Sequence, residues 1–225
     1  MSKEILPMQP MALGGDRRSA MITTPLRGRA VDFEYVVSLM QSTGIHSGWM
    51  PLNGQSDIYV ARNTLANAFL LQSKLENQIW IDGDIGWSRV DLLNLIDCEH
   101  PMVSGLYCGH GVPQWICRDQ EGNEIAPDKM PETGFKKAKL VGMGFLKVHR
   151  SVYETIIAKG LAPKYGVCHQ FFNGSIEDDF LLSEDYSFSS LCRKAGIQPM
   201  LNCDVRVLHG GKSLGKINPN SGSGR

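Results

Sequence analysis

The sequence predicts a single α/β domain in which helices flank a mixed, mostly parallel central sheet. Apolar strand-like runs alternate with helical patterns along the chain, which is typical of crossover connections between parallel strands. The length of 225 residues supports one sizeable core and is too short for two ordinary domains. Because the two ends show no periodicity, we expect a folded domain over residues 20–212 and flexible segments at 1–19 and 213–225.

The first half of the chain is expected to fold in the order strand, helix, helix, strand. Asp32 and Asp57 stand where the two helices begin, and an aspartate there can accept a hydrogen bond from the first turn. Gly44 follows the first helix, where a glycine readily takes the left-handed conformation that ends a helix. The expected elements are strand 20–24, helix 32–41, helix 57–76 and strand 78–82.

The second half adds three helices and three longer strands to this plan. Ser151 is the expected N-cap of one helix, and Gly196 is expected to end the last one. A hairpin is expected over 114–125, with its turn at 119–123, and a loop over 127–135. The other expected elements are helix 88–96, strand 102–108, strand 138–148, helix 151–159, helix 183–195 and strand 198–208.

The composition disfavours several classes of protein. The 23 Lys and Arg residues balance 23 Asp and Glu residues, so the basic excess that long nucleic acids attract is missing. No apolar run approaches the roughly 18 residues of a membrane span, and the N-terminus lacks a signal-peptide core. The six cysteines form no CxxC pair, which disfavours a disulfide scaffold and a structural zinc site. We expect a cytoplasmic protein without a membrane span.

Two aspartates one residue apart, Asp82 and Asp84, end the apolar strand that begins at Ile79. Ligands of open α/β sheets bind at the carboxyl ends of the strands. Two adjacent carboxylates repel each other unless a cation lies between them or a proton neutralises one. Hard oxygen ligands suit Mg²⁺ or Mn²⁺, which often bridge to the phosphates of a nucleotide. The pattern therefore indicates a metal site, with a simple Asp-Gly turn as the structural alternative.

Two later segments carry further candidate groups. Glu184 and Asp185 occupy the first turn of an expected helix, where the helix dipole alone already favours acidic residues. His209 follows the last expected strand and precedes two glycines and Lys212. Taken singly, each of these segments has an ordinary structural explanation.

Taken in order, the segments resemble the GT-A class of nucleotide-sugar-dependent glycosyltransferases, especially its family-2-like members, over about Met21 to Lys212. Asp82-Gly-Asp84 resembles the DxD metal motif of that class, and Glu184-Asp185 resembles its acidic catalytic pair. His209 resembles its late metal-coordinating histidine. Other matching segments are Thr23-Thr-Pro-Leu-Arg-Gly28, Ala61-Arg62-Asn63 and Gly142-Met-Gly144-Phe145.

This resemblance implies a single GT-A (Rossmann-like) domain and a metal-dependent enzyme. The enzyme would move a sugar from a nucleoside-diphosphate donor, with UDP as the expected nucleotide, to an acceptor hydroxyl, inverting the anomeric centre. It implies Mn²⁺ or Mg²⁺ held by Asp82, Asp84 and His209. It also implies Asp185 as the general base, with Glu184 orienting the base or the acceptor. The expected donor-binding residues are Thr24, Arg27, Arg62, Asp82 and Lys212.

Several alternatives stay open. A nucleotidyltransferase also uses paired acids at a strand end, and a non-catalytic nucleotide- or sugar-binding module could keep the fold and the metal. Residues 177–179 offer another choice of base, and Trp87 and Trp115 are either platforms for sugar rings or core residues. The acceptor, which is a glycan, a lipid-linked sugar, a protein or a modified DNA base, is expected to meet the loops at 108–135 and 163–180.

Overall fold

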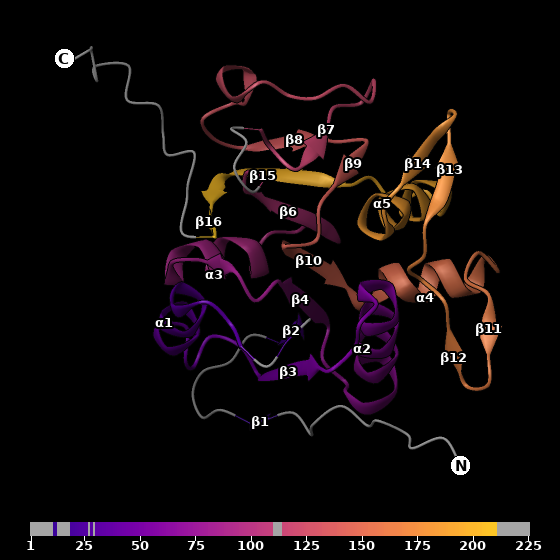
Figure 1. Cartoon of the computed structure of the whole chain (residues 1–225), viewed down its shortest axis with the longest axis horizontal. Helices are drawn as coiled ribbons and strands as arrows, with labels where there is room; N and C mark the ends of the chain where they lie inside the picture. Colours follow the sequence, from indigo (N-terminus) through magenta and orange to yellow (C-terminus); the bar gives the residue numbers. More distant parts are fainter. Residues whose placement is uncertain (1–10, 13–18, 27, 29, 110–113, 211–225) are drawn as a thin grey trace.

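The computed structural model describes residues 11–12, 19–26, 28, 30–109 and 114–210 (Figure 1). The expected flexible segments therefore lie outside the described residues, apart from Met11, Ala12 and Ser19. An eight-stranded sheet crosses the molecule in the order β1-β3-β2-β4-β10-β6-β15-β8. Helices cover both of its faces, which confirms the predicted α/β class and its mixed, mostly parallel sheet.

The strands of this sheet fall into two sets by direction. Five of those described run parallel to one another: β3 (Gly48–Asn53), β2 (Ala20–Leu26), β4 (Asn77–Ile81), β6 (Met102–Leu106) and β15 (Met200–Arg206). Running against them are β1 (Met11–Ala12), β10 (Phe145–His149) and β8 (Phe135–Lys137). Because β10 lies between β4 and β6, the carboxyl ends of the parallel strands share one edge with the start of β10.

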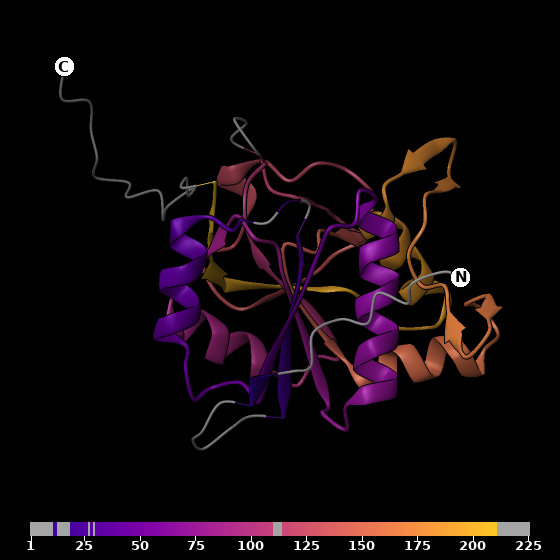
Figure 2. The same cartoon turned by 60° about the horizontal axis from the view of Figure 1, so that its bottom comes forward.

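The helices form two layers (Figures 1 and 2). One face of the sheet carries α1 (Phe33–Gln41) and α3 (Arg89–Ile96), and the other carries α2 (Ile58–Gln72), α4 (Arg150–Ala158) and α5 (Glu184–Lys194). Among the described helices, none combines the length and apolar character needed to cross a bilayer.

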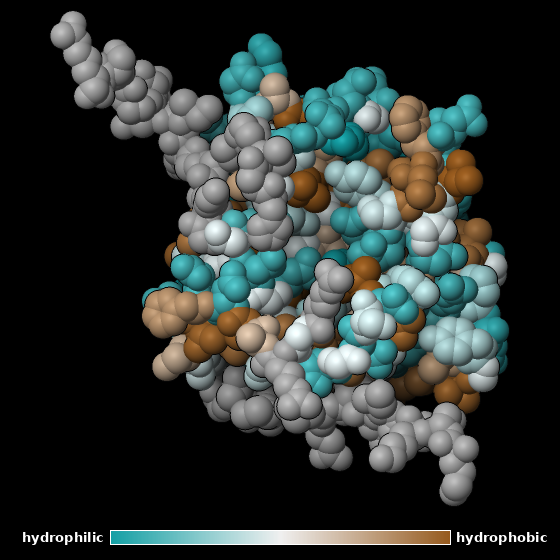
Figure 3. Space-filling view, in the orientation of Figure 1, coloured by the Kyte–Doolittle hydropathy of each residue, from teal (hydrophilic) through white to brown (hydrophobic). Residues whose placement is uncertain are grey.

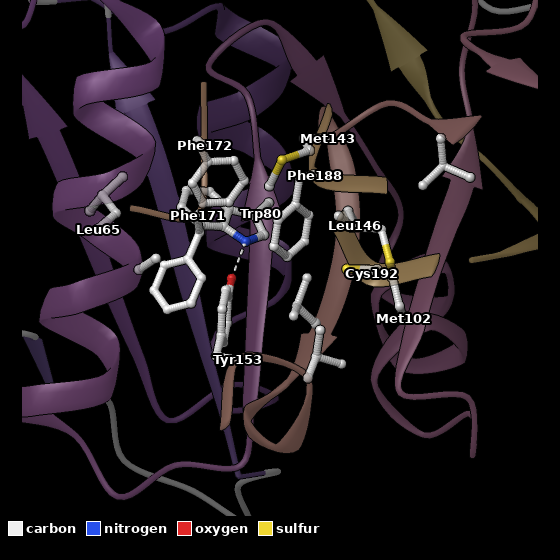
Figure 4. Packing of buried hydrophobic residues seen from close by; sticks show 14 of the residues in the cluster. Leu65, Trp80, Met102, Met143, Leu146, Tyr153, Phe171, Phe172, Phe188 and Cys192 are labelled. Carbon is white, nitrogen blue, oxygen red and sulfur yellow. Dashed lines mark hydrogen bonds between the residues drawn. The ribbon is translucent and has the colours of Figure 1, made fainter. Parts of the chain in front are cut away.

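The core lies on both faces of the sheet because the central strands carry apolar residues on both sides. Along β4, Trp80 packs toward α2, α4 and α5, while Ile79 and Ile81 pack toward α1 and α3. This alternation follows from the two-residue period of a strand. On the first face, the Trp80 indole donates a 3.0 Å hydrogen bond to the hydroxyl of Tyr153, surrounded by packed phenylalanines that include Phe188 (Figure 4).

The expected helices are found, with shifted ends. Helix 57–76 ends at Gln72, and the helix expected to start at Ser151 is α4, whose N-cap is His149. The His149 ring replaces Ser151 as the cap because it accepts the Ser151 backbone N–H. The expected strand 138–148 is divided into β9 (Leu140–Val141) and β10 by the segment 142–144.

Several short strands were not predicted. The β3 strand was missed, as were the hairpins β11 (Lys164–Tyr165) with β12 (Cys168–His169) and β13 (Ser175–Glu177) with β14 (Phe180–Leu182). The expected hairpin at 114–125 is present in part, since Arg118 pairs with Glu124 across the predicted turn. Its strand β7 (Cys117–Arg118) pairs with β9.

Candidate active site

The two aspartates lie where β4 ends, at the edge of the sheet shared by the parallel strands. After Ile81 the chain turns, and the Ile85 N–H donates a 3.1 Å hydrogen bond to the Asp82 carbonyl. The next strand, β5 (Ile85–Gly86), pairs antiparallel with β16 (Leu208–His209). This pairing carries His209 to the aspartates, so that its Nε2 lies 3.3 Å from Oδ2 of Asp84.

His209 is oriented by two further contacts. Its Nδ1 lies 2.6 Å from the Cys108 carbonyl oxygen, and its ring meets the Tyr107 ring edge-on, with centroids 5.5 Å apart. Burial lowers the pKa of His209, but hydrogen bonds with Asp84 and with the Cys108 carbonyl raise it more, so the pKa lies above its ordinary value. Because a carbonyl oxygen can only accept, Nδ1 carries a proton; the hydrogen bond to Asp84 needs a second proton on Nε2, and loss of that second proton leaves a lone pair that can bind a cation.

Arg62 lies between two acidic side chains, Asp82 at the end of β4 and Glu184 at the start of α5. It projects from α2 with 4% of its surface exposed, and its Nη2 lies 3.4 Å from both carboxylate oxygens of Asp82. Its Nε lies 3.4 Å from Oε1 of Glu184. Burial raises the pKa of Asp82 and of Glu184, and the guanidinium partly offsets both shifts. The buried guanidinium of Arg62 is therefore the shared cation of two carboxylates, those of Asp82 and Glu184.

Asp185 lies beside this ion network in the first turn of α5. Its Oδ1 accepts a hydrogen bond from the Ser183 hydroxyl and a 2.7 Å bond from the Tyr186 N–H. Its charge acts on Arg62 and Asp82. The structure thus brings Asp82, Asp84, Glu184, Asp185 and His209 to one edge of the sheet.

The other candidate bases occupy a different position. Asp178 and Asp179 form the two-residue turn between β13 and β14, and both have positive φ, 52° and 65°. Glu177 pairs with Arg193 at 2.9 Å. Glu177 and Asp178 are engaged in contacts that hold the hairpin, so Asp185 is the better-placed candidate for a base.

The remaining predicted site residues are dispersed. Thr24 is fully buried and its hydroxyl bonds to the hydroxyl of Tyr35 and to the indole of Trp49, so this predicted donor-binding residue is not accessible to a ligand in the structure. Trp87 and Trp115 are buried core residues with 5% and 2% of their surfaces exposed. The two other donor-binding residues that the sequence predicted, Arg27 and Lys212, lie outside the described residues.

A cavity lies next to the ion network, between the carboxyl end of β2 and the start of α2. Its volume is about 420 Å³, and Pro25, Leu26, Asp57, Tyr59 and Ala61 are among the residues that line it. Leu26 also contacts the loop between Asp82 and Asp84, since a Cβ atom on Gly83 would lie 2.9 Å from its Cδ2, so this wall of the cavity reaches the end of β4.

The oxygen and nitrogen ligands at this edge fit a cation that a bound phosphate also coordinates. Within the described ranges, no cluster of three or more His, Cys, Asp or Glu side chains has the spacing of a complete metal site. Asp84 and His209 do form a converging pair, and the Nδ1 contact with a carbonyl is typical of metal-binding histidines. Mg²⁺ and Mn²⁺ commonly take one or two protein ligands, with phosphate oxygens and water completing the shell. Asp82, the third predicted ligand, is instead held by Arg62.

Tyr107 is a site residue that the sequence analysis did not single out. The Gly144 N–H donates a 2.8 Å hydrogen bond to its hydroxyl. A Cβ atom on Gly142 would lie 2.1 Å from that hydroxyl oxygen, and one on Gly144 would lie 2.9 Å from its Cζ. The Gly-x-Gly segment therefore lets the ring of Tyr107 approach the backbone and reach His209. The Gly-x-Gly pattern can be read from the sequence, but its contact with Tyr107 cannot.

Gly142→Ala is expected to destabilise the protein by about 1–3 kcal/mol, because the new methyl group overlaps the Tyr107 hydroxyl. Urea unfolding measures this loss. Gly174→Ala is the matched control, since its Cβ would meet only a carbonyl oxygen at 3.6 Å. Equal stability of the two variants would contradict the close approach of Tyr107.

Comparison with known proteins supports the fold. No known family model matches the sequence, and neither does any curated protein. Similar solved structures include A197 from STIV, with a TM-score of 0.57, 14% identity and 84% of each chain covered. They also include GalNAc-T7 crystallised with UDP, GalNAc and Mn²⁺, with a TM-score of 0.52 and 11% identity. That match covers 88% of this chain and 44% of the GalNAc-T7 chain, so this chain spans less than half of that protein. The fold is that of a single Rossmann-like GT-A domain.

Proposed function

We propose that this protein is a metal-dependent glycosyltransferase that moves a sugar from a nucleoside-diphosphate donor, with UDP as the expected nucleotide, to an acceptor hydroxyl. The observation that carries the proposal is the meeting of two groups at one sheet edge: the Asp84–His209 pair, and the carboxylates around Arg62 with Asp185 beside them. The ligands of the GalNAc-T7 crystal structure favour the same class of donor, as an argument from fold.

The donor's nucleoside is assigned to the cavity between β2 and α2, which leaves its diphosphate directed toward the end of β4. Asp84 and His209 would hold Mn²⁺ or Mg²⁺, which when bound supplies positive charge against the negative charge of the leaving diphosphate. Arg27 and Lys212 remain proposed phosphate contacts. Arg62 is too deeply buried to be a primary phosphate clamp in this structure, so its assigned role is to position Asp82 and Glu184.

The acceptor hydroxyl needs a base because it is a weak nucleophile. Asp185 takes its proton as the acceptor oxygen forms a bond to the anomeric carbon. The bond between that carbon and the diphosphate oxygen breaks, and its electron pair leaves with the diphosphate. Both local hydrogen bonds to Asp185 end on Oδ1, so Oδ2 is the oxygen assigned to the proton. Attack from the side opposite the diphosphate inverts the anomeric centre.

Asp84→Asn is expected to weaken Mn²⁺-dependent UDP binding by at least about 10-fold, because the variant loses a charged oxygen ligand. His209→Ala is expected to have a smaller effect because it removes a neutral ligand, and Asp82→Asn a smaller one still because Arg62 holds that carboxylate. Isothermal titration calorimetry with UDP, with and without Mn²⁺, measures the difference. Asp128→Asn, an exposed residue away from the site, is the control. Unchanged metal-dependent affinity in the Asp84 variant would remove the metal assignment.

Turnover separates an enzyme from a non-catalytic binding module. With Mn²⁺ present, the wild-type protein is expected to release UDP from at least one of UDP-glucose, UDP-galactose, UDP-GlcNAc and UDP-GalNAc. Binding of UDP without any release, with or without added acceptors, would favour the binding module.

A further inference from the structure

We propose that a second cavity, between the 118–124 turn and the β13–β14 hairpin, is the acceptor site and that it takes a neutral saccharide. The inference rests on the proposed function for its acceptor role. The cavity has a volume of about 570 Å³, and Arg118, Glu124, Lys139, Phe180 and Tyr186 are among the residues that line it. It is separate from the cavity assigned to the nucleoside, since the two share no lining residue.

The cavity lies beside the assigned base. Leu182 and Tyr186 both line it, and these two residues flank the turn of chain that holds Asp185. The backbone N–H of Tyr186 donates directly to Asp185, and the charge of Asp185 acts on the Tyr186 phenol. Asp185 does not itself line the cavity, so a saccharide packed against Tyr186 would have to extend past the start of α5 to bring a hydroxyl to the base.

The hairpin wall of the cavity is held in place by polar contacts. Glu177 accepts hydrogen bonds from Ser190 and Arg193 of α5, and Lys139 donates a 2.9 Å bond to Asp178. The positive φ angles of the two turn residues match the tight turn that suits a two-residue hairpin loop. The hairpin projects beside α5 (Figures 1 and 2). These contacts tie the hairpin to α5 and to Lys139.

The hairpin presents apolar side chains that the protein itself does not cover. Ile176, Phe180 and Leu181 are 74%, 72% and 81% exposed. Figure 3 shows apolar surface gathered where this hairpin lies. Of the three, Phe180 and Leu181 line the cavity. An occupant of the cavity therefore needs an apolar face.

The rest of the lining favours hydroxyl groups and disfavours anions. Four acidic residues line the cavity, at positions 121, 124, 177 and 178, against two basic ones, Arg118 and Lys139. Arg118 pairs with Glu124 at 2.9 Å and lies 5.9 Å from the centroid of the Tyr186 ring. Carboxylates accept hydrogen bonds from hydroxyls, and their excess repels phosphate. A sugar ring offers an apolar face to an aromatic ring and hydroxyls at its edge, so a neutral saccharide matches both features.

Saturation-transfer NMR and calorimetry test the assignment with lactose, maltose, cellobiose and chitobiose, and with glucose 1-phosphate as the anionic comparison. UDP and Mn²⁺ are present in every sample. The wild-type protein is expected to bind at least one neutral disaccharide and to bind glucose 1-phosphate more weakly. Phe180→Ala and Tyr186→Ala are each expected to weaken the disaccharide by about 5-fold, the scale of losing one aromatic contact. Val167→Ala, equally exposed on the β11–β12 turn, is the control and should bind normally.

The outcomes separate this inference from the proposed function. Three results, each obtained with normal UDP binding, would overturn the saccharide site alone. They are that no disaccharide binds, that glucose 1-phosphate binds more tightly than the disaccharides, or that disaccharide affinity is unchanged in Phe180→Ala. Phe180 is exposed, so its variant is informative even where Tyr186→Ala fails to fold. Disaccharide binding by a protein that does not bind UDP with Mn²⁺ would overturn the acceptor role together with the proposed function.

Discussion

Asp185→Asn is expected to lower turnover at least about 100-fold and to leave UDP affinity nearly unchanged. The amide cannot take the acceptor proton, which accounts for the loss of rate. Its carbonyl oxygen can still accept the bonds from Ser183 and Tyr186, so the start of α5 is preserved. Initial rates of UDP release from the active donor measure turnover, and calorimetry with UDP and Mn²⁺ measures affinity.

Glu154→Gln on the exposed face of α4 is the matched control for this loss of a carboxylate, and its rate should equal that of the wild-type protein. A near-normal rate in Asp185→Asn would remove Asp185 as the base and direct the search to Glu184. An NMR spectrum showing that the product keeps the donor's anomeric configuration would contradict inversion.

Local signals predicted much of the fold. Helices α1, α2, α3 and α5 begin directly after Asp32, Asp57, Ser88 and Ser183, the residue types that favour an N-cap. Of these four, only Ser88 accepts a capping hydrogen bond with its side chain, so the expected bonds at Asp32 and Asp57 are not formed. The central strands were found because burial on both faces makes most of their positions apolar. The strand β3 was missed, because it contains a proline and glycine and is specified by pairing with β2 rather than by its own pattern.

The break between β9 and β10 has the same kind of cause. The run 138–148 is apolar enough for one strand, but Tyr107 packs against Gly142 and Gly144 and interrupts it. The hairpin β13–β14 depends on contacts with Ser190 and Arg193, which follow it in the chain. Long-range contacts of this kind leave no local periodicity to read.

The same distinction applies to the candidate site. The placement of Asp82, Asp84 and His209 at one edge could be predicted because each follows an expected strand whose direction fixes that edge. Arg62 was predicted to contact the donor, yet its burial against Asp82 and Glu184 depends on residues 20 and 122 positions further along the chain. No pattern within α2 shows that contact.

Arg62→Met is expected to lower the free energy of unfolding by about 3–5 kcal/mol, the usual effect of removing one partner from a buried ion network. Methionine fills much of the space, so the loss reports on charge rather than on a cavity. Asp82 and Glu184 would remain partly buried without their cation. Urea unfolding at neutral pH measures the change, with Lys74→Met, the loss of an exposed cation, as the control.

The double variant Arg62→Met, Glu184→Gln isolates the electrostatic part of this effect. Replacing the Glu184 carboxylate by an amide removes one of the two uncompensated charges, so the double variant should be more stable than Arg62→Met alone. UDP binding with Mn²⁺ should also weaken in Arg62→Met, because Asp82 loses the contact that holds it beside Asp84. A loss of stability no greater than that of Lys74→Met would show that Arg62 does not hold the two acids, and Asp82 would then be available as a third metal ligand.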